Sequence, residues 1–243
     1  MTIHDVQTQG IIIKRTPYKD NDMILHVYTK EYGKIGIHAR GIQKMSSKNA
    51  RGCQMMMLSE LTISLKKGLS SLIRAYPIHH YRHIQEHLES EIVAQYILEY
   101  YYRYIEENQP DEKAFEILFE ALNALHQGYM PLLVYLLFQV FILEDNGINP
   151  CVDGCVICDL TQVTALSVVD GGFLCYQHQG HHSTLDKEVL KAFRHIHKIP
   201  MKNISDIHID KEIIKKLVPI MNGFIEEYSG VTLKTSLFIQ QIV

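Results

Sequence analysis

The spacing of apolar residues changes near residue 80, and this change restricts the possible folds more than any other feature of the sequence. Before it, residues 10–13 and 23–29 form short apolar runs rich in β-branched residues, and residues 61–65 alternate with the two-residue period of a half-buried strand. After Pro77 the apolar residues recur every three to four positions, which is the period of an amphipathic helix. The sequence therefore predicts an α+β protein in which the strands come first and the helices follow.

The strand-rich segment fits a small β-barrel. Four or five short strands in about eighty residues suit an OB-type barrel in number and size. An SH3-like barrel fits the same strand pattern, so the pattern alone leaves the topology open between the two.

The later residues predict a helical domain. Residues 132–143 are apolar on nearly every side, which is typical of the buried central helix of a bundle. Further on, Ser183-Thr184-Leu185-Asp186 resembles a capping box and is expected to open a helix that runs to about residue 198.

Composition excludes several classes of protein. Hydrophobic residues make up 47% and charged residues 21%, as in globular rather than disordered chains. The longest apolar run, residues 130–143, is too short to cross a bilayer, and the first residues lack the pattern of a signal peptide. We therefore expect a cytoplasmic protein that makes no use of a membrane.

Charge is distributed unevenly along the chain. Residues 1–80 hold twelve Lys/Arg and five Asp/Glu, whereas residues 81–150 hold three and twelve. Such asymmetry indicates a segment that binds polyanions, joined to one that does not. The alternative is that the basic and acidic segments dock on each other.

Four of the five cysteines lie within 25 residues, and a histidine follows them. A Cys-x2-Cys and a Cys-x2-His pair each place two ligands at one tight turn, and two such turns complete the tetrahedron that Zn²⁺ prefers. Four protein ligands leave no open position for water, so we predict one structural zinc ion held by Cys155, Cys158, Cys175 and His178. Cys151 is an alternative fourth ligand, and a cluster of free thiols without metal is the other alternative.

These features predict four parts of the chain. They are a basic OB-fold-like barrel (1–80), the first part of a helical domain (81–149), a zinc-binding insert (150–182) and the second part of the helical domain (183–243).

We expect no catalytic activity. A zinc-dependent hydrolase or nucleobase deaminase is the enzyme class to consider, and a deaminase needs His-x-Glu and Pro-Cys-x-x-Cys. His87-Leu88-Glu89 and Pro150-Cys151 resemble these motifs, but three residues rather than two separate Cys151 from Cys155. Phosphate-binding loops and nucleophile elbows are also absent from the sequence.

Basic residues of the first segment surround a predicted strand and the loop after it. On a small barrel, strands and loops can collect such residues into a groove that follows a phosphate backbone. Because no base-reading helix is predicted, we expect weak sequence preference and strong salt dependence. The predicted phosphate contacts are Lys14, Arg15, Lys34, Arg40, Lys44, Lys48 and Arg51.

The order of these parts resembles the bacterial RecO family of DNA repair and recombination mediators. The likeness spans nearly the whole chain and is carried by short sequences, among them Gly10-Ile11-Ile12-Ile13-Lys14, Ala39-Arg40-Gly41, Gly147-Ile148-Asn149-Pro150 and Gly171-Gly172-Phe173-Leu174-Cys175. One departure is His178, which stands where the family usually has a fourth cysteine, and imidazole is an ordinary zinc ligand.

The resemblance implies a non-enzymatic, nucleoid-associated protein that binds single- and double-stranded DNA and anneals complementary strands. It also implies that the protein pairs with RecR, helps to load RecA, and binds the C-terminal tail of single-strand binding protein as some members do. A zinc-containing protein–protein adaptor, whose basic segment binds an acidic partner, is the alternative that the residues leave open.

Overall fold

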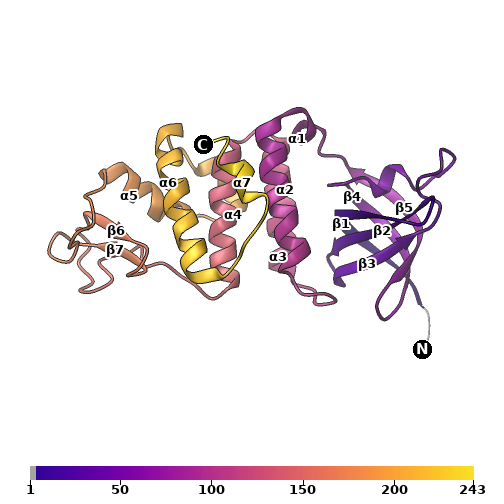
Figure 1. Ribbon diagram of the computed structural model, residues 1–243, viewed down its shortest axis with the longest axis horizontal. Coiled ribbons are helices and arrows are strands. Elements are labelled where there is room, and N and C mark those ends of the chain that lie inside the picture. The colour runs from indigo at the N-terminus through magenta and orange to yellow at the C-terminus, as the bar shows by residue number, and fades with distance from the viewer. Residues whose placement is uncertain (1–3) are drawn as a thin grey trace. The chain divides into compact units, whose positions relative to one another are not determined.

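A computed structural model describes residues 4–243 (Figure 1). The chain forms two compact units, Met1–Gln127 and Gly128–Val243. The first unit holds a β-barrel and three helices, and the second holds the remaining helices and a small two-stranded sheet. An α+β chain with its strands first is thus confirmed, whereas the predicted boundaries of the four parts stay a prediction.

Five strands close into a barrel at the N-terminal end of the chain. They are β1 (His4–Tyr18), β2 (Asp22–Thr29), β3 (Gly33–Ala39), β4 (Leu58–Leu65) and β5 (Ser70–His79). Their order is β1-β2-β3-β5-β4, in which β1 pairs with β4 and only β3 and β5 run parallel. This closed five-stranded arrangement is that of an OB-type barrel, so the OB-type prediction is confirmed over the SH3-like one.

The barrel core follows from the alternation of the strands. Inward residues such as Leu25, Ile37 and Ile63 are fully buried, while their neighbours along each strand are more exposed. A short 3-10 helix, η1 (Arg51–Cys53), adds Cys53 to this core. Burial raises the pKa of the Cys53 thiol to about 12, which makes this cysteine an inert core residue.

Three helices complete the first unit: α1 (Arg82–Glu86), α2 (Leu88–Arg103) and α3 (Glu112–His126). Asp111 caps α3 by accepting a hydrogen bond from the Ala114 amide at 3.1 Å. The barrel meets these helices through Tyr28, whose ring packs edge-on against Tyr101 with the centroids 5.0 Å apart. Gly33 has a φ of +64° and lies so close to the Gln109 backbone that a Cβ would come within 2.2 Å of its carbonyl oxygen.

The second unit is built around α4 (Pro131–Asp145), whose residues 132–143 are all buried. The predicted central helix is therefore confirmed. α4 contacts the helix α5 (Lys187–Ile196), the 3-10 helix η2 (Met201–Asp206), and α6 (Lys211–Phe224) with its π-helical extension η3 (Ile225–Ser229). The unit also contains the hairpin of β6 (Ala165–Ser167) and β7 (Gly172–Leu174), and the short helix α7 (Ser236–Ile239).

One helix start differs from the sequence prediction. The structure places Asp186 at the N-cap of α5, so a capping box that begins at Ser183 is wrong. The Leu185 amide donates to the Thr164 carbonyl at 2.9 Å, which ties this segment to the loop before β6. Long-range pairing of the backbone has overridden the local capping signal. In the described part of the chain, no helix combines the length and the apolar character needed to cross a membrane.

Candidate metal centre and nucleic-acid interface

The structure brings together the four residues that the sequence proposed as metal ligands. The ligand atoms of Cys155, Cys158, Cys175 and His178 all lie within 4.8 Å of one another. Cys155 and Cys175 are buried, whereas Cys158 is exposed, so the cluster lies at the surface with one side covered.

The distances within this cluster fit a tetrahedral metal ion. With metal–sulfur bonds near 2.3 Å and metal–nitrogen bonds near 2.0 Å, tetrahedral ligands are expected about 3.8 Å apart for two sulfurs and about 3.6 Å for sulfur and nitrogen. The Cys158 and Cys175 Sγ atoms are 3.7 Å apart, and His178 Nδ1 lies 3.6 Å from Cys155 Sγ. A third distance, 3.3 Å from Cys175 Sγ to His178 Nδ1, is slightly shorter than this ideal, so the four residues are candidate ligands for one metal ion.

Two tight turns present the ligands. In the first, the Asp159 amide donates to the Cys155 carbonyl at 2.8 Å, and Asp159 has a φ of +60°. In the second, directly after β7, the His178 amide donates to the Cys175 carbonyl at 3.0 Å. Each Cys-x2-Cys or Cys-x2-His spacing thus closes one turn of backbone, as the sequence pattern implied.

The electrostatics of Cys155 favour its thiolate, which is the metal-binding form. Desolvation by burial raises the pKa of Cys155, but the backbone amides of Cys175, Ile157 and Cys158, together with the His178 side chain, lower it to about 6. The lowered pKa favours, at neutral pH, the thiolate form in which Cys155 can bind a metal ion.

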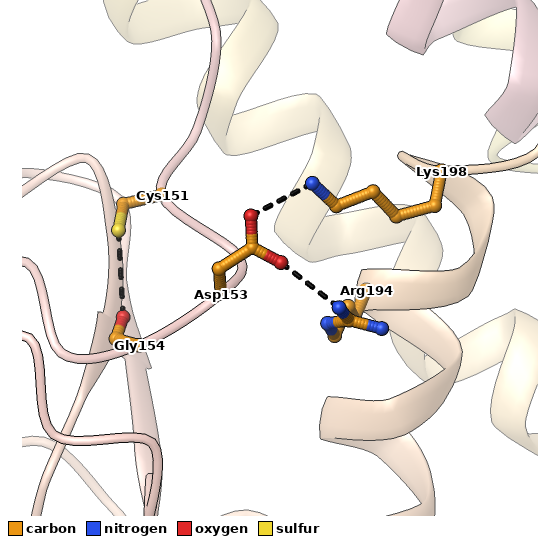
Figure 2. A network of polar contacts seen from close by, with 5 residues as sticks. All are labelled: Cys151, Asp153, Gly154, Arg194 and Lys198. Atoms are coloured by element: carbon orange, nitrogen blue, oxygen red, sulfur yellow. Dashed lines mark hydrogen bonds and ion pairs between the residues drawn. The ribbon is translucent and has the colours of Figure 1, made fainter.

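Cys151 lies outside the cluster. Its thiol is directed to the Gly154 carbonyl oxygen at 3.4 Å, as Figure 2 shows. Its backbone forms a bridge with Gly172, where a Cβ would come within 2.4 Å of the Cys151 oxygen. The structure therefore favours His178 over Cys151 as the fourth ligand.

A cavity of about 780 Å³ lies between α5 and the segment that carries the candidate metal ligands, residues 150–182. Its apolar lining includes Val152, Phe173 and Leu190, and its cationic lining consists of Lys187, Lys191 and Arg194. Asp153 also lines the cavity, and its carboxylate accepts from Arg194 at 3.0 Å and from Lys198 at 2.8 Å (Figure 2). The hydrogen bond from Lys198, supported by Arg194, lowers the pKa of Asp153.

The seven basic residues that the sequence proposed for phosphate contact separate into two groups. The first group is exposed and lies after β3, in the loop and η1 that together span residues 40–53 and are here called the basic loop. Its members are Arg40, Lys44, Lys48 and Arg51. This loop is anchored at both ends. At its start Asp22 accepts from the Gly41 amide at 2.7 Å, and further on the Asn49 side chain bonds the backbone of β5 at Ile73 and Ala75.

The second group is turned toward other parts of the first unit. Lys34 is only 5% exposed and donates to the Tyr102 carbonyl at 2.8 Å, and burial lowers its pKa. The Lys14 ammonium lies 3.6 Å from the centroid of the Tyr102 ring. Arg15 donates to the Gln54 side chain at 3.2 Å. For Lys14 and Lys34 the structure thus supports the alternative in which the basic segment docks on the helices, and Lys34 cannot reach a phosphate in this arrangement.

Asp22 and Asn49 are positioning residues that the phosphate-contact prediction did not include. The Gly41 amide, followed by the His38 side chain, holds the pKa of Asp22 below its usual value. Neither residue is positively charged, so the sequence gives no reason to connect them with DNA binding. The structure shows that Asp22 and Asn49 fix the position of the loop that carries the cations. An acidic residue at a strand start and an asparagine between cations are weak signals by themselves.

Comparison with known proteins gives matches over almost the entire chain. Residues 1–81 match the family model "Recombination protein O N terminal", and residues 85–237 match "Recombination protein O C terminal". A DNA repair protein RecO of Bacillus cytotoxicus is 28% identical over 97% of both chains. A protein of the same name from Listeria monocytogenes is 28% identical over 96% of this chain and 93% of its own.

Proposed function

Because this chain belongs to the recombination protein O family, we propose that it acts in DNA repair by binding single- and double-stranded DNA and annealing complementary strands. One observation carries the proposal. Four exposed cations, Arg40, Lys44, Lys48 and Arg51, follow one another along a loop and η1 that Asp22 and Asn49 fix to the barrel. A phosphate backbone that crosses this loop would meet a row of positive charge.

The mechanism needs no catalytic residue. Cations that neutralise phosphates on two strands reduce the repulsion between them, and base pairing then supplies the free energy of annealing. Contacts to phosphate position the strands without reading their sequence. RecO-type activity of this kind would place the protein in the cytoplasm, associated with the nucleoid.

The test is the salt dependence of binding to labelled oligonucleotides, followed by an annealing assay. We expect the logarithm of the binding constant to fall linearly with the logarithm of salt concentration. Arg40→Ala should weaken binding alike for all sequences and reduce the slope by about 1. Lys211→Ala, which removes an exposed cation at the start of α6, is the matched control and should leave the slope unchanged. Absence of binding at low salt, or a sequence-dependent loss, would contradict the proposal.

For the metal centre we propose one structural zinc ion held by Cys155, Cys158, Cys175 and His178. The donor set supports this, because thiolate and imidazole ligands in tetrahedral spacing select Zn²⁺ among common cellular metals. Bound zinc would cross-link the two turns and leave no position for a reacting water.

We further propose that RecR is a direct partner and that RecA is affected through it, as the family resemblance implies. The supporting observation is the match to both family domains over nearly the whole chain. Co-elution of the two purified proteins in size-exclusion chromatography tests the proposal. Independent elution at micromolar concentrations, with and without DNA, would refute it.

A second candidate function is that of an adaptor for an acidic partner, and the cavity beside α5 favours it. Its apolar lining and its cations suit an acidic peptide such as the C-terminal tail of single-strand binding protein. In this proposal the acidic partner meets the second unit rather than the basic barrel, so Arg194→Glu is the variant that tests it.

A further inference from the structure

The outer face of β5 is unusually apolar for an exposed strand. Tyr76 is 56% exposed, and Ile73 and Ile78 are each 47% exposed. Arg74 lies between them and places its guanidinium 5.4 Å from the centroid of the Tyr76 ring. Large apolar side chains grouped on one exposed strand usually mark a binding surface.

The local geometry of β5 explains why Ile73 faces the same side as Arg74 and Tyr76. The β4–β5 ladder has two register shifts, and Ile73 and Ile78 are the residues that the pairing skips. An extra residue at such a β-bulge changes the direction of its side chain, and bulges are enriched beside binding sites. In a regular strand Ile73 would face the opposite side from Arg74 and Tyr76, whereas Ile78, two residues after Tyr76, would share their side even without a bulge.

Positive charge borders this surface on the side of the loop that follows β3. The Asn49 side chain accepts from the Ala75 amide at 3.1 Å and donates to the Ile73 carbonyl at 3.2 Å, which holds the basic loop against β5. Lys48 and Arg51, both exposed, flank Asn49 in the chain. On the other side Tyr76 pairs with Glu60 of β4, which is exposed and negative.

We propose that Ile73, Arg74, Tyr76 and Ile78 form a stacking site for the unpaired bases of single-stranded DNA. This rests on the proposed DNA binding and adds a means of distinguishing single strands from duplexes. A strand whose phosphates lie over Lys48 and Arg51 can place its bases on Tyr76, away from Glu60. Aromatic side chains stack on any base, whereas a duplex keeps its base faces covered.

The first test compares the affinities of Tyr76 variants of the full chain for an oligothymidine and for a blunt duplex. Tyr76→Ala should reduce single-strand affinity on the order of tenfold and leave duplex affinity within about twofold, because one stacked base is lost. Tyr76→Phe keeps the ring and should restore single-strand binding. Arg51→Ala, in contrast, should weaken binding of both forms. Because Tyr76 lies outside the barrel core, these variants should fold, which circular dichroism checks.

The second test uses the absence of tryptophan from the chain. Tyr76→Trp introduces a unique fluorophore, and stacking of bases should quench its emission when oligothymidine is added but not when duplex is added. Tyr176→Trp, at an exposed tyrosine of the second unit, is the matched control and should not respond.

Three outcomes would overturn the stacking site. Equal losses of single-strand and duplex affinity in Tyr76→Ala would show that the β5 surface contacts only the backbone, although DNA binding itself would stand. An emission change that depends on protein concentration and not on DNA would show that the surface joins two copies of the chain. Failure of the unaltered protein to bind either DNA would remove the proposed function as well.

Discussion

Asp22 shows how one side chain can hold a functional loop in place. Its carboxylate accepts from the Gly41 amide at 2.7 Å with one oxygen and contacts the His38 ring at 2.7 Å with the other. The first cations of the loop flank Gly41 in the chain: Arg40 directly precedes it, and Lys44 follows three residues later. Asp22 would itself repel phosphate, yet its negative charge positions Arg40 and Lys44, which would attract phosphate.

The lowered pKa of Asp22 predicts a pH-dependent effect on stability. A group whose pKa is lower in the folded than in the unfolded protein stabilises the fold above its unfolded value, near pH 4, and loses that effect as the pH falls through the folded value. Asp22→Asn should therefore lower the unfolding temperature at neutral pH, and the difference from the unaltered protein should shrink below about pH 4.

Thermal unfolding between pH 3 and pH 7 checks this prediction. Asp20→Asn, which removes the same charge from an exposed neighbour in the turn, serves as the control and should have little effect. A difference for Asp22→Asn that stays constant across this pH range would exclude the carboxylate as its cause.

At the scale of elements, the segment that carries the candidate metal ligands has little secondary structure or apolar core of its own. Its sheet consists of two strands of three residues, and its own buried cluster holds only Cys155, Ala165, Leu174 and Cys175. So small an apolar core cannot offset the entropy of ordering the chain. Zinc binding, by contrast, contributes about 10–16 kcal/mol in isolated zinc-finger peptides.

Removal of the metal is therefore predicted to unfold this segment locally. Cys158→Ser, or a chelator, should abolish bound zinc and raise amide hydrogen exchange throughout residues 150–182, while the buried helix α4 stays protected. Cys151→Ser should retain the metal, because the Cys151 thiol faces the Gly154 carbonyl. The opposite result, with zinc lost in Cys151→Ser and kept in His178→Ala, would make Cys151 the fourth ligand.

At the scale of the whole molecule, the proposed binding sites for DNA and for the acidic tail lie in different compact units. The exposed cations of the basic loop lie within Met1–Gln127, and the cavity beside α5 lies within Gly128–Val243. If the proposed sites are correct, DNA binding and binding of the acidic tail can be separated by mutation.

Paired variants are predicted to separate the two activities. Arg194→Glu should weaken binding of the acidic tail peptide several-fold by reversing a charge at the cavity, and should leave DNA binding unchanged. Arg40→Ala should weaken DNA binding and leave binding of the tail peptide unchanged. Lys211→Glu is a charge-matched control for the second unit. Fluorescence anisotropy of each labelled ligand measures both affinities. If Arg40→Ala weakens both ligands equally, the barrel binds the tail and the cavity does not.

Much of this fold could be predicted because its signals are local. The two-residue period of the strands, the apolar run of 132–143 and the two Cys/His turns each depend on neighbours within a few positions, and each recurs in the structure. A Cys-x2-Cys pair closes its own turn wherever it lies, so the spacing of Cys155, Cys158, Cys175 and His178 predicted which side chains come together.

Whether each basic side chain is buried or exposed depends instead on residues far away in the sequence. Lys34 and Arg40 look equivalent in the sequence, yet Lys34 is buried against Tyr102 while Arg40 is exposed. Likewise the segment before α5 is tied to Thr164, and the exposure of Ile73 depends on its register with β4. A local pattern records residue type and period, but the pairing of segments far apart in the chain decides which side chains remain at the surface.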